Sequence, residues 1–299
     1  MNTRYVLWVR HCQSCANVAM KGIPNIMAQM YRQPLCTKKG IHQSYAFGEE
    51  LGKVIDNILK TYNLDGVKFY ASYLPRAVET AKLISAKCPS KKNSQINRIP
   101  FVNEHIRFYN KSSGTQNITD IYKSNCHVRA LNTILSIGLD INEDHLFEDI
   151  MKNMLCKSVL HKNGSINKCV ITENPDNYNN FKKKILPKLT LNKLHIIVSH
   201  GKYIRRDVLA ELDWPDRKIN NLEANLVKYT KDGSIFKGEC IESKELTKCN
   251  NKINEIKRGD ISKLPLNEEY KNYFNCKYRY HDKSKILRLK RKSSIQKYC

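Results

Sequence analysis

The sequence predicts an α/β fold: a three-layer sandwich with a mostly parallel central sheet and helices on both faces. Short apolar runs of strand type alternate, over the first 240 residues, with longer segments whose apolar residues recur at helical spacing. This alternation is typical of parallel sheets whose crossover helices cover both faces. In addition, His11 and His200 each follow a strand-type run directly. Ligands of such sheets bind at the carboxyl ends of strands, so the two histidines mark the expected functional edge.

The first half of the chain supplies three expected strands and two expected helices. The strand-type runs are short and rich in Val, Ile, Phe and Tyr, whereas the helical segments repeat apolar residues every three or four positions. Pro75 suits the first turn of the second helix, where a missing N–H costs nothing. In chain order the expected elements are strand 5–9, helix 40–62, strand 67–72, helix 73–88 and strand 98–104.

The second half repeats the alternation and then loses it. An Asp-Gly pair at Asp232 and Gly233, flanked by strand-type residues, predicts a hairpin. No regular element is expected beyond Ile241. The expected elements are helix 174–189, strand 194–201, a helix over 202–212 and the hairpin 222–240.

These elements divide the chain into a catalytic domain, residues 1–240, and a basic C-terminal extension, 241–299, expected to be partly disordered. Within the domain, residues 105–165 are polar and weakly periodic, which favours an inserted lid. Residues 270–299 carry ten Lys and Arg but one acidic residue. Three interpretations of this tail stay open: a solvated end, a contact with nucleic acid or acidic lipid, and a nuclear localisation signal around 288–292.

Composition gives a further indication of partners and compartment. The formal net charge is +24, which favours polyanionic partners, although a lysine- and asparagine-rich coding bias explains it equally well. Eleven scattered cysteines without a signal peptide predict free thiols in a reducing compartment. No stretch approaches the roughly 18 apolar residues of a membrane span. We therefore expect a soluble, cytoplasmic protein, with the nucleus as the alternative, and leave its oligomeric state open.

The strand-end residues have the chemistry of a phosphoryl-transfer site. An imidazole attacks phosphorus when it is neutral and held in one tautomer, and neighbouring cations keep it neutral. Arg10 and Arg76 would supply those cations and bind a phosphoryl group with planar guanidinium groups. His11 is then the candidate nucleophile, with His200 beside it. Glu104, at the end of the third strand, is the best-placed general acid.

Five motifs in order resemble the histidine phosphatase superfamily, whose fold is called phosphoglycerate-mutase-like. "VRHCQSCAN" is similar to the family's "RHG(E/Q)(S/T)xxN" pattern and "PLCTKKGIHQSYAFGEEL" to "PLTxxGxxQAxxLGxxL". "YASYLPRAVETAKLI" resembles "SxLxRAxxTAxxI", "VNE" resembles "LxE", and "IIVSHGKYIR" resembles "VxHGxxIR". Together these motifs span residues 5 to about 229. Each one alone is a weak match, but the ordered set is specific.

The resemblance implies a phosphomonoester hydrolase that works through a phosphohistidine, without a metal ion or cofactor. It makes His11 the phosphate acceptor and Glu104 the residue that protonates the leaving oxygen and then activates water. The implied phosphate-binding residues are Arg10, Asn17, Arg76, His200 and Gly201. The implied substrate is a phosphorylated small molecule or phosphoprotein.

Two departures from the family pattern bear on this assignment. Cys12 stands where the family usually has glycine, which fits only if the backbone there does not need a positive φ. The segment that follows lacks the "FxGWxD"-type sequence of cofactor-dependent mutases, so a phosphatase is favoured over a phosphoglycerate-mutase-type phosphotransferase. The second function class is a catalytically degenerate phosphatase fold that acts as a polyanion-binding module.

Cys12 and Cys15 have the spacing of a redox dithiol or of half a zinc site. The dithiol interpretation leaves the two histidines and the arginines unexplained. A zinc site would need two more ligands, which Cys36 and His42 offer only at irregular spacing. Small fillers at a helix start are therefore the favoured role of both cysteines, and oxidative switching beside the nucleophile is a minor alternative.

Overall fold

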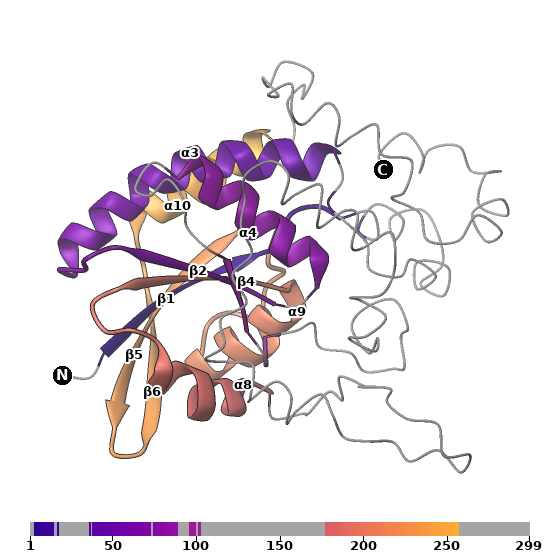
Figure 1. Cartoon of the computed structure of the whole chain (residues 1–299). Coiled ribbons are helices and arrows are strands. Elements are labelled where there is room, and N and C mark those ends of the chain that lie inside the picture. Colours follow the sequence, from indigo (N-terminus) through magenta and orange to yellow (C-terminus); the bar gives the residue numbers. More distant parts are fainter. Residues whose placement is uncertain are drawn as a thin grey trace, which may run out of the picture.

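The structure is a computed structural model with one central sheet (Figure 1). It describes residues 3–14, 17, 36, 38–72, 74–88, 96–99, 101–102 and 177–256. The expected lid, 105–165, and the basic tail, 270–299, therefore lie outside the described residues. In the part of the chain that is described, no helix combines the length and apolar character needed to cross a membrane.

The sheet has six strands in the order β3-β2-β4-β1-β5-β6. The four strands from β3 to β1 run parallel, and β5 and β6 add to the β1 edge as an antiparallel hairpin. This arrangement confirms the expected mostly parallel sheet. The strands are β1 (Thr3–Arg10), β2 (Val67–Ala71), β3 (Ile96–Arg98), β4 (Leu194–Ser199), β5 (Ala224–Asp232) and β6 (Ile235–Ile241).

Helices cover both faces of the sheet, which gives the three expected layers (Figure 1). On one face lie α3 (Lys38–Thr61), α4 (Pro75–Lys87) and α10 (Lys244–Ile256). On the other lie two helical segments: α8 (Asn177–Asn180), η1 (Phe181–Ile185) and η2 (Leu186–Lys188), and then α9 (Gly201–Tyr203), η3 (Ile204–Leu209) and η4 (Ala210–Leu212).

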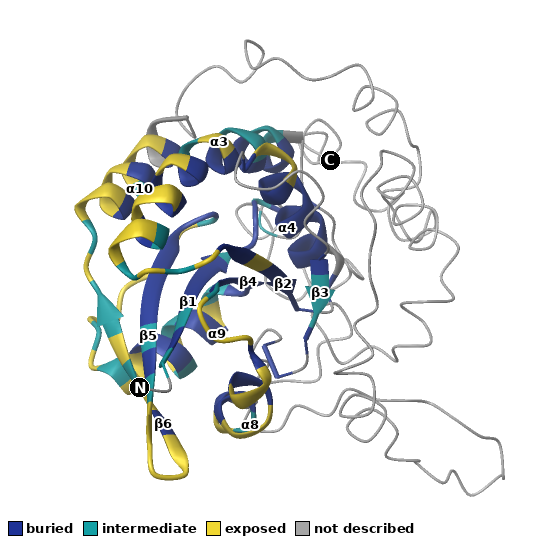
Figure 2. Cartoon of the chain, turned by 60° about the vertical axis from the view of Figure 1, so that its left-hand side comes forward, coloured by how far each residue is buried: buried dark blue, intermediate teal, exposed yellow. Residues whose placement is uncertain are grey.

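Each layer interface is a separate apolar core. Alternate residues of β1 point to opposite faces, so Leu7 and Val9 join the cluster under α3, α4 and α10. Val6 and Trp8 join the cluster under the helical segments of the opposite face. The central strands are buried on both faces, whereas exposed residues gather on the outer side of α10 and at the tip of the β5–β6 hairpin (Figure 2). The apolar, non-alternating sequence of β1 follows from this double burial.

Two expectations about the elements need correction. The third strand, expected at 98–104, is β3 at Ile96–Arg98, and the chain then continues past Ile99 to Val102 without strand pairing in the described residues. Beyond Ile241 no element was expected, yet α10 packs against α3 with Leu246, Cys249 and Ile253 in the core. The packed body therefore extends past residue 240.

Candidate active site

The parallel pairing of β1 and β4 brings the two strand-end histidines together. Arg10 pairs in register with Ser199, so His11 and His200 are the next residues on neighbouring strands. The backbone N–H of His11 donates to the carbonyl of Ser199 at 2.9 Å. The ring centroids of His11 and His200 are 5.1 Å apart, and both side chains are buried. The sheet thus builds the expected pair of imidazoles at its carboxyl edge.

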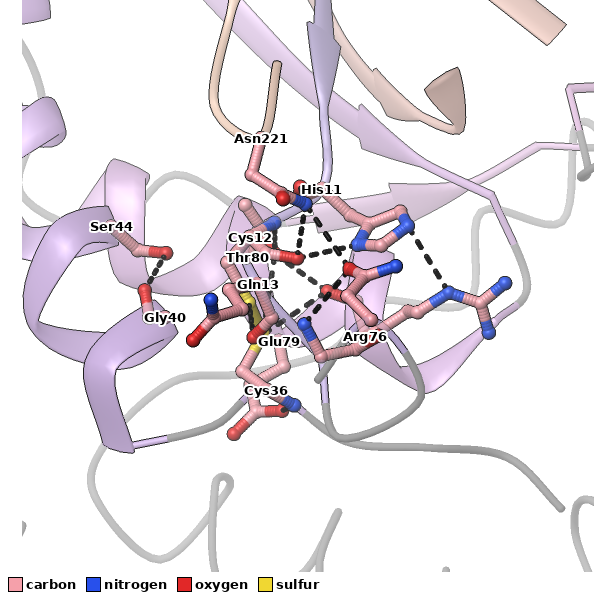
Figure 3. The surroundings of a disulfide bond; sticks show 12 residues. His11, Cys12, Gln13, Cys36, Gly40, Ser44, Arg76, Glu79, Thr80 and Asn221 are labelled. Atoms are coloured by element: carbon pink, nitrogen blue, oxygen red, sulfur yellow. Dashed lines mark hydrogen bonds between the residues drawn. A yellow bond between two sulfur atoms is a disulfide. The ribbon is translucent and has the colours of Figure 1, made fainter. Parts of the chain in front are cut away.

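The hydrogen bonds of His11 define its tautomer (Figure 3). Nδ1 lies 2.6 Å from the carbonyl oxygen of Cys12, which can only accept, so Nδ1 carries the proton. Nε2 lies 3.3 Å from Nε of Arg76, which can only donate. Nε2 therefore holds the lone pair and faces a guanidinium group. This is the nitrogen that can attack an electrophile.

The site keeps both imidazoles neutral. Burial lowers the pKa of His11 well below its ordinary value, and the charges of Arg76 and Arg10 lower it further, against the opposing hydrogen bond to the Cys12 carbonyl. Burial likewise lowers the pKa of His200 well below its ordinary value, with added repulsion from Arg76, His11 and Arg10. Neutral rings beside two cations form a pocket that favours an anion.

His200 is held by the neighbouring strand. Its Nε2 lies 2.7 Å from the hydroxyl of Ser72, the residue that follows β2. The Ser72 N–H in turn donates to the carbonyl of Val198 at 3.0 Å. A serine hydroxyl can donate or accept, so this bond orients the His200 ring without selecting one of its tautomers. The partner of His200 is a hydroxyl, whereas that of His11 is a cation.

Arg10 is oriented by a close approach to Gly201. A Cβ at position 201 would lie 2.8 Å from Nε of Arg10 and 3.0 Å from its Cδ, so any other residue there would push the guanidinium group aside. The glycine after His200 is therefore required by the path of the guanidinium group across the start of α9. The far end of Arg10 donates from Nη1 to the carbonyl of Ile219. Gly201 contributes space for Arg10, a physical role that its motif position did not reveal.

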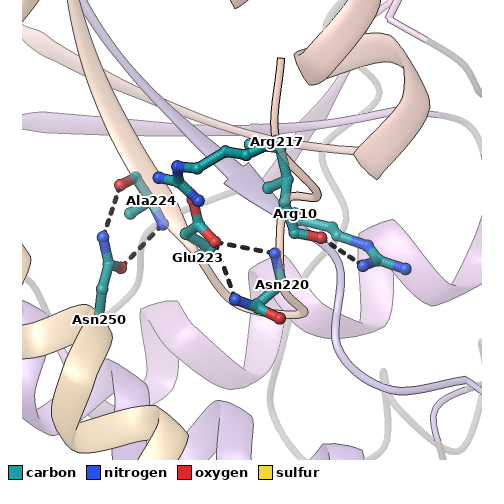
Figure 4. A network of polar contacts seen from close by, with 7 residues as sticks. Arg10, Arg217, Asn220, Glu223, Ala224 and Asn250 are labelled. Carbon is teal, nitrogen blue, oxygen red and sulfur yellow. Dashed lines mark hydrogen bonds and ion pairs between the residues drawn. The ribbon is translucent and has the colours of Figure 1, made fainter. Parts of the chain in front are cut away.

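The loop before β5 supports Arg10 through a carboxylate network (Figure 4). Glu223 is buried and pairs with Arg217 at 2.7 Å, while its other carboxylate oxygen accepts from the N–H of Asn220 at 2.8 Å. The carbonyl of Glu223 accepts from the backbone N–H of Arg10 at 3.0 Å. The Glu223 carboxylate is thus satisfied within the loop. It serves to fix the main chain around Arg10.

The two peptide groups on either side of the Cys12 Cα are held by two residues that sequence reasoning missed. The N–H of Cys12 donates to Oγ1 of Thr80 at 3.0 Å, and Thr80 donates to the carbonyl of Arg76 at 2.6 Å. Nδ2 of Asn221 lies 2.9 Å from the carbonyls of both His11 and Cys12. Thr80 occupies the threonine of the "SxLxRAxxTA" pattern, so the motif could have marked it. No motif marks Asn221.

Cys12 itself is joined to Cys36 by a disulfide, drawn at the centre of Figure 3. The expectation of free thiols is therefore wrong for this pair. Cys15, the other cysteine of the minor dithiol alternative, lies outside the described residues. Cys88, Cys240 and Cys249 are free thiols among the residues that are described. Cys12 is not among the described residues with a positive φ. Its backbone conformation therefore allows a cysteine where the family pattern has glycine.

Two proposed site residues have different outcomes. Asn17 lies near the nucleophile loop, where its Oδ1 accepts from the N–H of Ser14 at 3.1 Å and from Asn221 at 3.3 Å. Its expected contact with a phosphoryl group stays a prediction. Glu104 lies outside the described residues. The chain reaches the site just before it, because the hydroxyl of Ser199 donates to the carbonyl of Val102 at 2.7 Å.

Comparisons with known proteins found solved structures of low similarity to this chain. No family model and no curated protein matches the sequence. Similar solved structures include a mycobacterial glucosyl-3-phosphoglycerate phosphatase in complex with VO3, at 13% identity and a TM-score of 0.44 over 80% of this chain and 98% of that one. An ecdysone phosphate phosphatase from Bombix mori with tungstate has 13% identity and a TM-score of 0.41 over 80% and 92%. A phosphoglycerate mutase from Bacillus anthracis has 13% identity and a TM-score of 0.41 over 83% and 97%.

Proposed function

We propose that this protein is a phosphomonoester hydrolase of the histidine phosphatase type, which transfers a phosphoryl group to His11 and then to water. The observation that carries the proposal is the state of His11. Its ring is buried and neutral, its proton is on Nδ1, and its Nε2 lone pair lies against the Arg76 guanidinium. The guanidinium donates to this lone pair at 3.3 Å, and in the proposed reaction it would bind the phosphate that the lone pair attacks.

The reaction has two displacement steps. In the first, Nε2 of His11 forms a bond to phosphorus, the bond from phosphorus to the ester oxygen breaks, and a general acid protonates the departing alcohol. In the second, water attacks phosphorus, the N–P bond breaks and returns its electron pair to Nε2, and the same group, now a base, accepts the proton of the water. Inorganic phosphate leaves and His11 is neutral again.

Arg10, Arg76 and His200 would stabilise the charge on the oxygens of the transferring group. Burial makes each donor more effective because no water screens it. Loss of one such preorganised donor costs on the order of 3 kcal/mol of transition-state stabilisation. In the absence of substrate the same cations keep His11 unprotonated, so binding and nucleophile activation depend on the same charges.

Glu104 remains the proposed acid and base. Its support is the position of Val102, whose carbonyl accepts from Ser199, the residue next to His200. Two residues of extended chain span about 7 Å, and Glu104, two residues beyond Val102, lies outside the described residues. The leaving group of an alkyl phosphate needs a proton, whereas that of an activated aryl phosphate does not.

The alternatives have less support. A degenerate, polyanion-binding fold was suggested by Cys12, but the backbone at that position accepts cysteine and His11 keeps its orientation. A phosphotransferase of the mutase type would use the same nucleophile. The absence of the mutase-type segment after the first motif favours water as the final acceptor. A polyanion contact through the tail stays a separate proposal.

Hydrolysis of 4-nitrophenyl phosphate in the presence of EDTA tests the proposal. Wild type is expected to turn over in the chelator, and His11→Ala is expected to lose activity. His42→Ala, a histidine on α3 outside the contacts described above, is the matched control and should keep it. Activity that survives in His11→Ala, or that EDTA abolishes and a divalent metal restores, would contradict the mechanism.

A further inference from the structure

The carbonyl of Cys12 controls the ring of the proposed nucleophile. It accepts the Nδ1 proton of His11 at 2.6 Å and so keeps the lone pair on Nε2. A shift of this one peptide group would release the ring or exchange its tautomers. The anchors of the Cys12 residue therefore decide how well His11 is aligned with Arg76.

The disulfide to Cys36 is one of these anchors, and Cys36 in turn contacts the main chain of Arg76. Cys36 is buried, and its Sγ lies 3.6 Å from the carbonyl of Arg76 and 3.5 Å from the hydroxyl of Thr80. Its N–H donates to the buried carboxylate of Glu79 at 2.8 Å. All three of these partners belong to the first turns of α4.

The bond thus links the main chain beside His11 to a residue that contacts the helix carrying Arg76. The Cα atoms of Cys12 and Cys36 are 6.1 Å apart, within the usual range for a disulfide. Cys12 is held to α4 directly, by its N–H on Thr80, and indirectly, through its disulfide to Cys36 (Figure 3). The second link exists only when the two sulfurs are oxidised.

We propose that Cys36 is a positioning residue for His11, acting through its disulfide to Cys12, so that phosphoryl transfer depends on the thiol state of this pair. The proposal rests on the function proposed above. In the oxidised chain the Cys12 carbonyl is fixed against Nδ1. In the reduced chain Thr80 and Asn221 hold the Cys12 peptide alone, and the ring is less well aligned with Arg76.

The redox step is a thiol–disulfide exchange with a dithiol reductant. A thiolate of the reductant attacks one sulfur of the pair, and the bond between Cys12 and Cys36 breaks to release a cysteine thiolate. The second thiol of the reductant then displaces the other cysteine. The products are two cysteine thiols and one cyclic disulfide of the reductant. Both cysteines are fully buried, so the exchange requires local opening.

The test measures turnover of 4-nitrophenyl phosphate by the full chain before and after reduction with dithiothreitol, with peptide mapping of the cysteines. The reduced wild type is expected to lose about tenfold in kcat, because small misplacement of a reacting group is costly, with a smaller change in KM. Reoxidation should restore the rate. Cys36→Ala should have the reduced rate under both conditions, and Cys240→Ala, which removes a free thiol, should respond like wild type.

A second readout does not depend on activity. In histidine-labelled protein, ¹H–¹⁵N spectra distinguish the two neutral tautomers of His11. The oxidised chain is expected to show the Nδ1–H form alone, and the reduced chain and Cys36→Ala should show exchange between tautomers. The same kcat and the same spectrum in both thiol states, with reduction of the pair verified by mapping, would overturn the proposal. A tautomer change without turnover in either state would instead count against the proposed function.

Discussion

The ends of β1 and β4 each lead into a buried histidine, and the two histidines differ in their hydrogen-bond partners. Both follow neighbouring parallel strands, both are buried, and the pKa of each lies well below its ordinary value. His11 bonds a main-chain carbonyl and a guanidinium, whereas His200 bonds a serine hydroxyl. The fold makes both rings neutral. In the proposed mechanism His11 is the nucleophile, because its partners leave the lone pair on Nε2, and His200 is a donor to the phosphoryl group.

The largest expected effect separates these two roles. His11→Ala should remove the covalent path and reduce kcat by roughly four orders of magnitude or more, as loss of a nucleophile does. His200→Ala should reduce kcat by about 10² to 10³, because it removes one donor to the transferring group. Steady-state turnover of 4-nitrophenyl phosphate measures both. Equal losses would mean that the two histidines act as one unit, contrary to this division.

The next effect tests the cation beside the nucleophile. Arg76→Lys keeps the charge but loses the planar group that reaches His11 and that we propose to bind a phosphoryl oxygen. We expect kcat/KM to fall by about 10² in Arg76→Lys and further in Arg76→Ala. Arg205→Lys is the matched control, because Arg205 pairs with Asp216 and makes no contact with His11 in the described structure. A fully active Arg76→Lys would show that charge alone is sufficient.

A smaller effect concerns Asn221, which bonds the carbonyls of His11 and Cys12. Asn221→Ala should lower kcat by about tenfold because one anchor of the Cys12 peptide is lost. Asn221→Asp should be worse, since a carboxylate would face two carbonyl oxygens. Measurement of kcat and KM for both variants tests this order. An aspartate variant more active than the alanine variant would place Asn221 outside this positioning role.

The smallest effect is on stability, and it involves a third buried histidine. Burial lowers the pKa of His195 to about 4. Between its unfolded pKa of about 6.5 and this folded value, the unfolded chain binds a proton that the folded chain does not, so stability falls as pH falls. His195→Gln should remove up to about 1.4 kcal/mol per pH unit of that slope. Denaturant unfolding at pH 7, 6 and 5 measures it, and an unchanged slope would contradict the low pKa.

Sequence reasoning located the residues whose chemistry is visible in their type. His11, His200, Arg10 and Arg76 were predicted because two histidines follow strands at one sheet edge and an arginine lies beside that edge in each of two motifs. Asn221 and Thr80 were missed because they act on main-chain groups, which the sequence does not display. The pairing of Cys12 with Cys36 was also hidden, since spacing along the chain does not report distance in the fold.

The secondary structure was also predicted in part, with some elements placed correctly and one missed. Strands buried on both faces have continuous apolar runs and were placed within a few residues, apart from β3, which has three residues and begins before its expected position. Helix α10 was missed because only Leu246, Cys249 and Ile253 of its described residues reach the core. These positions recur at helical spacing, but polar residues outnumber them and the amphipathic pattern was overlooked, and the contact with α3 stabilises the helix.

The measurement that tests the central claim most directly is the position of phosphate on the trapped enzyme. Brief incubation with 4-nitrophenyl phosphate, followed by alkaline quench and peptide mapping, should give an acid-labile phosphoryl group on His11. Because Nδ1 is bonded to the Cys12 carbonyl, NMR of the labelled peptide should place phosphorus on Nε2. Phosphate on Nδ1, on His200 or on a cysteine would contradict the account.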